Sequence, residues 1–215
     1  MLFTSRIVDH GARFVVKGRI PVQRKNATIA FVTIAVAVIA IDQWTKFLVL
    51  DRLTTALDQA PSRVGQFFGA APPPAFDGYH YRPKEQVVLS DDFFRLRYAE
   101  NPGAAFGLFR NVPPDYRGPL FHLVSLGAVV LILNTFRKLK GEKKERWALI
   151  GLPLVFGGAL GNYVDRLARG FVVDFLEAHW FDKAYWPAFN VADSAIVVGV
   201  GLLLVDSFVR KPETK

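Results

Sequence analysis

Four long apolar runs dominate this chain and limit what it can fold into. They cover residues 27–50, 119–136, 147–168 and 188–209, and each is close to the roughly 20 residues that an α-helix needs to cross a bilayer. Hydrophobic residues make up 51% of the 215-residue chain. A soluble domain of this length would not need unbroken apolar runs. The sequence therefore predicts an all-α polytopic membrane protein, with four transmembrane helices in one membrane-embedded domain.

The net charge of +8 is distributed unevenly between the predicted spans. Residues 51–118 are balanced, with eight basic and eight acidic side chains. Cytoplasmic segments of membrane proteins carry an excess of Lys and Arg. We therefore expect cytoplasmic tails at 1–26 and 210–215, a cytoplasmic loop at 137–146, and outer loops at 51–118 and 169–187. The excess is read as an orientation signal and not as a nucleic-acid-binding patch. It comes from Arg6, Arg13, Lys17, Arg19, Arg24, Lys25, Arg137, Lys138, Lys140, Lys143, Lys144, Arg146, Arg210, Lys211 and Lys215.

The basic tail and the apolar residues 29–41 also resemble a secretory signal, and Ala35-Val36-Ala37 resembles its cleavage triplet. However, the triplet lies inside the apolar run, which resumes after Lys46. The segment is therefore expected to be retained as the first span.

Cysteine is absent from the chain. This excludes disulfides, thiol nucleophiles and cysteine-ligated metals. No HExxH-type pattern is present either. We expect neither a metal nor a cofactor.

The outer loops carry short β-strand patterns. Residues 86–89 and 93–98 alternate in part around an Asp91-Asp92 turn, and residues 170–175 are rich in β-branched and aromatic side chains. Before them, the proline-rich residues 54–85 predict an irregular insertion. After them, Asn101-Pro102-Gly103 is a turn signal whose glycine allows close approach of the backbone. A small extracytoplasmic β-rich cradle is expected.

Polar residues cluster where the spans meet these outer loops. The predicted topology brings four carboxylates to one depth, and carboxylates at the edge of hydrocarbon usually mark a functional site. Asp42 and Lys46 lie four apart on one helix face, so they can pair. The cluster contains Asp42, Lys46, Asn162, Asp165, Arg166, Asp174, Asn190 and Asp193.

Three kinds of chemistry fit such a cluster. Two neighbouring carboxylates that share a proton would make an aspartic-type hydrolase, which we favour. A transporter or proton relay would use the same carboxylates for a cation, although such sites normally lie near the midplane. Ser194 or Ser125 with Lys46 would make a Ser/Lys hydrolase. A structural or assembly protein is the remaining alternative. On the residues alone, Asp165 fits the carboxylate pair as well as Asp174 does.

Four ordered motifs resemble the lipoprotein signal peptidase (signal peptidase II) family. They are Asp42-Gln-Trp-Thr-Lys46, Asn101-Pro-Gly-Ala-Ala-Phe106, Gly158-Ala-Leu-Gly-Asn162 with Asp165-Arg166 and Val173-Asp174-Phe175, and Phe189-Asn190-Val-Ala-Asp193-Ser194. Together they cover most of residues 41–204. One such motif would be weak, but four in this order are highly specific.

The resemblance implies an aspartic endopeptidase of the bacterial inner membrane with an active site that faces the periplasm. Its substrate would be a diacylglyceryl-prolipoprotein, cleaved on the N-terminal side of the lipid-modified cysteine. The resemblance places the catalytic pair at Asp174 and Asp193, so Asp165 becomes structural. It implies supporting roles for Asn101, Gly103, Asn162, Arg166, Asn190, Asp42 and Lys46. We expect a monomer surrounded by membrane lipid. The long basic tail and the insertion at 54–85 depart from the family pattern.

Overall fold

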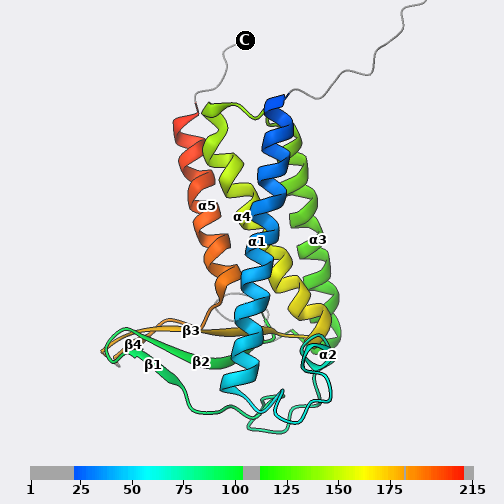
Figure 1. Cartoon of the computed structure of the whole chain (residues 1–215), viewed down its shortest axis with the longest axis vertical. Coiled ribbons are helices and arrows are strands. Elements are labelled where there is room, and N and C mark those ends of the chain that lie inside the picture. Colours follow the sequence, from blue (N-terminus) through cyan, green and yellow to red (C-terminus); the bar gives the residue numbers. More distant parts are fainter. Residues whose placement is uncertain (1–21, 104–111, 182, 211–215) are drawn as a thin grey trace, which may run out of the picture.

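A computed structural model describes residues 22–103, 112–181 and 183–210. Within these ranges, four long helices run side by side: α1 (Val22–Leu53), α3 (Pro114–Lys138), α4 (Arg146–Arg169) and α5 (Val191–Val209) (Figure 1). All four are long and apolar enough to cross a membrane. The prediction of four long apolar helices is confirmed. Most of the predicted tail at 1–26 lies outside the described residues, and so do residues 211–215.

The helix boundaries differ from the predicted ones where polar residues continue a helix or cap it. Helix α1 begins and ends outside the predicted 27–50, since its flanking polar residues remain helical. The predicted start of the last span at residue 188 is wrong. Asn190 caps α5, and Phe189 instead pairs with Leu176 in the sheet. The helix therefore begins after its polar N-cap, and the apolar residues Ala188 and Phe189 lie outside it.

Glycines allow α4 to pack closely against its neighbours. A Cβ atom at Gly157 would lie 2.8 Å from the Val38 Cβ of α1, and one at Gly161 would lie 2.7 Å from Asp42 Oδ2. On the α5 side, a Cβ at Gly158 would lie 2.4 Å from the Ala192 carbonyl oxygen. The small-xxx-small pair expected in this span is thus used to bring α1 and α4 together.

A four-stranded antiparallel sheet lies across one end of the bundle and projects to one side of it (Figure 1). Its order is β1 (Val87–Ser90), β2 (Phe94–Asn101), β3 (Val172–Trp180) and β4 (Ala184–Tyr185). The predicted strands are confirmed, although β3 is longer than the predicted extended segment. The predicted combination of a mainly helical chain with a small β-rich part is therefore confirmed.

The insertion at 54–85 is more ordered than its proline content predicts. It contains the short helix α2 (Arg63–Phe67), whose first turn is capped by Ser62. Leu57, Phe67 and Tyr81 are buried in an apolar cluster with the end of α1 and the base of the sheet. The expectation of an irregular insertion is therefore wrong in part, because buried apolar side chains fix it to the core.

Candidate functional site

Asp174 is the third residue of β3 and is almost fully buried. Its Oδ2 accepts a hydrogen bond from Asn101 Nδ2 at 3.0 Å, and its Oδ1 accepts one from Asn190 Nδ2 at 2.7 Å. Asn101 ends the neighbouring strand β2, and Asn190 caps helix α5. The carboxylate is therefore held between the sheet and the start of a transmembrane helix.

Asp193 lies in the first turn of α5, where it is half-buried. Its Oδ2 accepts from the backbone N–H of Asn190 at 3.1 Å, while the Asp193 N–H donates to Asn190 Oδ1 at 2.9 Å. This reciprocal pair is a capping box. Asn190 therefore contacts both aspartates, Asp174 through its side chain and Asp193 through both its backbone and its side chain.

Asn162 of α4 connects this pair to a buried lysine. Its Nδ2 donates to Asp193 Oδ1 at 2.8 Å. Its Oδ1 accepts from Lys46 Nζ at 3.0 Å and from Asn190 Nδ2 at 3.1 Å. Residues from α1, α4 and α5 thus form one continuous hydrogen-bonded network.

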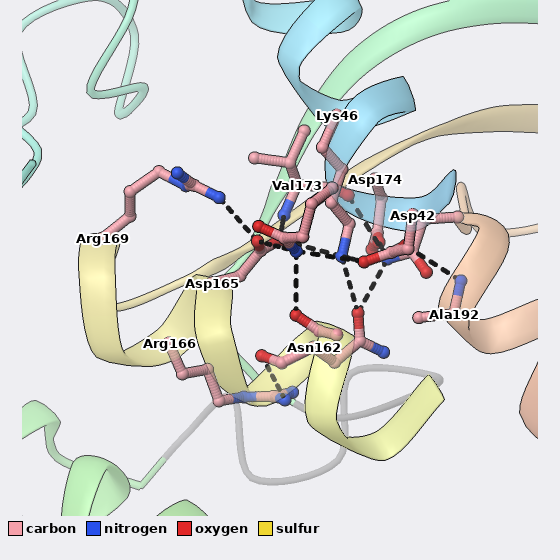
Figure 2. Close-up of polar contacts among 12 residues, drawn as sticks. Asp42, Lys46, Asn162, Asp165, Arg166, Arg169, Val173, Asp174 and Ala192 are labelled. Atoms are coloured by element: carbon pink, nitrogen blue, oxygen red, sulfur yellow. Dashed lines mark hydrogen bonds and ion pairs between the residues drawn. The ribbon is translucent and has the colours of Figure 1, made fainter. Parts of the chain in front are cut away.

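Lys46 has no exposed surface, and its ammonium group is surrounded by carboxylates (Figure 2). Lys46 Nζ lies 2.8 Å from Asp42 Oδ2 and 3.0 Å from Asp165 Oδ2. Asp42 also accepts from the backbone N–H of Ala192 through Oδ1 at 3.0 Å. The predicted pairing of Asp42 with Lys46 is confirmed, and it links α1 to the start of α5.

Asp165 stabilises the start of β3. Among the described contacts, none joins Asp165 to the asparagines that bind Asp174 and Asp193. Its Oδ2 accepts from the backbone N–H of Val173 at 3.0 Å, directly before Asp174. Its Oδ1 contacts Arg169 Nη2 at 2.5 Å and accepts from Gln43 Nε2 at 3.1 Å. Its contacts support a structural role. Arg169 and Gln43 were not among the site residues predicted from the sequence. The i, i+4 spacing of Asp165 and Arg169 is the signal that could have found Arg169.

Arg166 points to the loop after β2. Its Nη2 donates to the Gly103 carbonyl at 3.0 Å, and Gly103 N–H in turn donates to Asn101 Oδ1 at 3.0 Å. The guanidinium also lies over the Phe121 ring of α3 at 4.5 Å. Arg166 therefore holds the turn that presents Asn101 to Asp174. Residues 104–107, which continue this motif, lie outside the described residues.

Burial changes the acidity of Asp174. Desolvation, and then the negative charge of Asp193, raise the pKa of Asp174 to about 7. Hydrogen bonds from Asn101 and Asn190 and the charge of Lys46 oppose this rise. A carboxyl group with this pKa can hold or release a proton near neutral pH, which suits an acid–base catalyst.

Comparisons with known proteins identify the family of this chain. The family described as Signal peptidase (SPase) II matches residues 34–209. The chain is 43% identical to the "Lipoprotein signal peptidase" of Anaeromyxobacter sp. (strain Fw109-5) over 178 residues, covering 79% of this chain and 80% of that protein. It is 35% identical to the "Lipoprotein signal peptidase" of Syntrophus aciditrophicus, covering 88% and 98% of the two chains.

A solved structure shares the fold. The in meso structure of a bacterial membrane enzyme at 2.3 Å resolution superposes with a TM-score of 0.60 at 23% identity, covering 86% of this chain and 93% of that one. Since the family match spans most of the chain, from within α1 to the end of α5, this chain belongs to the signal peptidase II family, whose members are proteases that process prolipoproteins.

Proposed function

We propose that the chain is an aspartic endopeptidase in which Asp174 and Asp193 are the catalytic pair. The observation that carries this proposal is the position of Asn190, which hydrogen-bonds to Asp174 and to Asp193 at once. The raised pKa of Asp174 adds to it, because one carboxyl must keep a proton while the other is ionised.

The proposed reaction divides the roles between the two aspartates. Asp193, ionised, accepts a proton from a water molecule whose oxygen bonds to the scissile carbonyl carbon. Asp174, protonated, donates its proton to the carbonyl oxygen, so a neutral tetrahedral diol forms. Its collapse re-forms the carbonyl and breaks the C–N bond. Asp174 recovers its proton from a diol hydroxyl, and Asp193 passes its proton to the leaving amine.

The substrate proposed for this site is a prolipoprotein that carries a diacylglyceryl-modified cysteine, cleaved on the N-terminal side of that cysteine. The aspartates lie where α4 and α5 meet the sheet. A substrate whose acyl chains remain in lipid would thus present its peptide at this level, which turns cleavage into a positioned reaction. The charge distribution supports a site on the outer face of the inner membrane, with both termini cytoplasmic.

The Ser/Lys alternative is not supported by the surroundings of Lys46. Its ammonium group contacts two carboxylates and the Asn162 oxygen. Ser194 Oγ instead donates to the Asn190 carbonyl at 3.0 Å. Membership in a protease family also favours the hydrolase over the transporter or assembly alternatives.

The test is cleavage of a purified diacylglyceryl-prolipoprotein in detergent by Asp174→Asn and Asp193→Asn. Both changes are nearly isosteric, and each should lower the turnover by at least about 10³-fold while the protein stays folded. Asp92→Asn, in the exposed turn between β1 and β2, is the matched control and should keep full activity. Near-normal turnover by either variant would remove that residue from the pair, and Asp165→Asn would be tested next.

A further inference from the structure

The insertion at 54–85 lies behind the part of the sheet that carries the candidate site. Glu100 of β2 pairs with Val173 of β3, and Val173 directly precedes Asp174. Because side chains alternate along a strand, Glu100 and Val173 lie on the face of the sheet opposite Asp174. Tyr81 of the insertion is buried in the same apolar cluster as Val173. The insertion therefore covers the back of the two strands at the level of the site.

Asn101, the last residue of β2, contacts Asp174 on the other face of the sheet. Its Nδ2 donates to Asp174 Oδ2 at 3.0 Å. The end of a strand opens more readily than its centre, because the ladder of backbone hydrogen bonds stops there. An asparagine in this position therefore needs further contacts to keep its orientation. Arg166 holds the residues that follow, through the Gly103 carbonyl, and Glu100 is the residue that precedes Asn101.

Several groups bind the Glu100 carboxylate at once. Its side chain is 7% exposed. Glu100 Oε1 accepts from the N–H groups of His80 at 2.8 Å and of Tyr81 at 3.4 Å. It also accepts from the Tyr98 hydroxyl at 2.6 Å, and Glu100 Oε2 contacts His80 Nδ1. Since His80 and Tyr81 belong to the insertion, the carboxylate connects the end of β2 to the insertion, and hydrogen bonds to a carboxylate are among the stronger ones.

His80 also contacts the chain where β3 begins. Its imidazole stacks on the Phe171 ring, with 4.7 Å between the ring centroids and 24° between the planes. Phe171 is almost fully buried and directly precedes β3. His80 therefore contacts the end of β2 through Glu100 and the start of β3 through Phe171. These are the two chain segments that Asn101 and Asp174 join on the opposite face of the sheet.

We propose that Glu100 is a positioning residue, which the insertion holds through His80 so that Asn101 keeps its orientation toward Asp174. The insertion, which departs from the family pattern, thereby acts on the candidate site from behind the sheet. The consequence for cleavage rests on the proposed function, in which Asp174 must hold a proton. The hydrogen bond between Asn101 and Asp174 can be followed without cleavage.

Two variants loosen this contact from either side. Glu100→Ala removes the carboxylate, and His80→Ala removes the imidazole. Burial and the charge of Asp193 raise the pKa of Asp174, and the hydrogen bond from Asn101 opposes this rise. The titration midpoint of the Asp174 carboxyl group should therefore move to a pH at least about 0.5 higher in both variants. Isotope-edited NMR of the full chain in detergent, with carboxyl-labelled aspartate, measures it; the Asp174 signal is the one that Asp174→Asn lacks.

Glu177→Ala is the matched control. Glu177 lies on the same face of the sheet as Glu100, because both are opposite Asp174 in the alternation of the strands. Its side chain is 5% exposed, and it binds Arg95 and Arg97 in the projecting part of the sheet. Glu177→Ala and Glu100→Ala remove the same charge from the same face, so a charge effect on Asp174 is common to both. The midpoint in Glu177→Ala should stay at or below that of the unchanged protein.

An unchanged or lower midpoint in either Glu100→Ala or His80→Ala would overturn the proposal, since Asn101 would then keep its hydrogen bond without the insertion. A merely structural role would lower the unfolding temperature and leave the midpoint in place. If Glu100→Ala does not fold, His80→Ala decides, because the His80 side chain is 25% exposed and its loss leaves the backbone hydrogen bonds to Glu100.

Cleavage by the same proteins gives a second measurement. Misplacing a group at the site should lower kcat about 10-fold or more in Glu100→Ala and His80→Ala, with little change in KM. An unchanged kcat together with a raised midpoint would limit the role of Glu100 to the acidity of Asp174 and overturn its role in cleavage. Turnover by Asp174→Asn tests the proposed function separately, because the midpoint is measured without substrate.

Discussion

Asn190 combines a local structural role with contacts to both aspartates. As the N-cap of α5, it satisfies the N–H of Asp193, and its own N–H is satisfied by the Asp193 carboxylate. Its side-chain amide also reaches Asp174, Asn162 and the Val173 carbonyl. The capping motif that starts the helix therefore also fixes the separation and orientation of the two carboxyl groups.

The protonation of Asp174 predicts a pH limit on cleavage. Its pKa is raised to about 7, so the carboxyl group loses its proton as the pH rises through about 7. Since the proposed reaction needs this proton, kcat/KM should fall above this pH. The Asn101 hydrogen bond favours the ionised form, so Asn101→Ala should move this fall to higher pH while also lowering the rate. A pH–rate profile of both proteins checks this. A fall at the same or lower pH in the variant would contradict it.

Lys46 predicts a large effect on stability. Lys46→Met would leave Asp42 and Asp165 buried without their shared cation, and breaking a buried pair typically costs about 3–5 kcal/mol. Lys84→Met is the matched control. Lys84 pairs with Asp58 at 2.7 Å, but both side chains are well exposed, so its loss should cost at most about 1 kcal/mol. Thermal unfolding in detergent measures both; equal losses would show that the buried cluster is not a stabilising unit.

At the scale of elements, α4 organises the site because it faces both α1 and α5. Its glycines allow the close approach, and its end supplies Asn162, Asp165 and Arg166 to three different contacts. The contact of Asn162 with Asp193 joins α4 to α5, so it depends directly on the distance between these two helices.

Two glycine substitutions test this dependence. Gly158→Ala would place a methyl group 2.4 Å from the Ala192 carbonyl oxygen and push away the residue before Asp193. Overpacking of this kind costs about 1–3 kcal/mol, and we expect cleavage to fall with it. Gly201→Ala meets nothing within 4 Å in the described structure, and it should be neutral or stabilise by up to about 1 kcal/mol. The unfolding temperature and the turnover of the two variants are measured. Equal unfolding temperatures and equal turnover would mean that the α4–α5 contact tolerates added volume.

The insertion at 54–85 is tied to the site from two directions. Glu100, which directly precedes Asn101, accepts from the His80 N–H at 2.8 Å and from the Tyr98 hydroxyl at 2.6 Å. Burial, followed by the charge of Glu100, raises the pKa of Tyr98, so its hydroxyl remains a donor. On the other side, Arg169 donates to the Phe67 carbonyl of α2. The insertion thus supports both the Asn101 turn and the Asp165 brace.

At the scale of the whole molecule, the distribution of basic residues and the position of the sheet indicate the same orientation in the membrane. The basic loop Lys138–Arg146 lies at the end of the bundle opposite the sheet, between α3 and α4 (Figure 1). From the positive-inside rule, we propose that the sheet and the aspartates lie on the outer side of the membrane.

Single-cysteine labelling tests this orientation without interference, because the chain has no cysteine of its own. Glu85→Cys lies on the sheet side and Lys143→Cys in the opposite loop, and both positions are exposed. In spheroplasts, a membrane-impermeant maleimide should label Glu85→Cys at once and Lys143→Cys only after lysis. The reverse pattern would invert the topology.

The sequence alone determined the four spans, their expected orientation and the residue types of the site, because hydropathy, charge bias and ordered motifs are local properties of the chain. It also indicated the strands, through β-branched and aromatic residues. Tertiary structure decided which carboxylates share a partner. Sequence spacing did not distinguish Asp165 from Asp174 as a member of the carboxylate pair. In the folded chain, Asp165 contacts Lys46, Arg169 and Val173. Asp174 contacts Asn101 and Asn190. The packing of the insertion was likewise decided by distant apolar partners. Such contacts join residues up to 150 positions apart, as Ala192 and Asp42 show, and no local pattern encodes them.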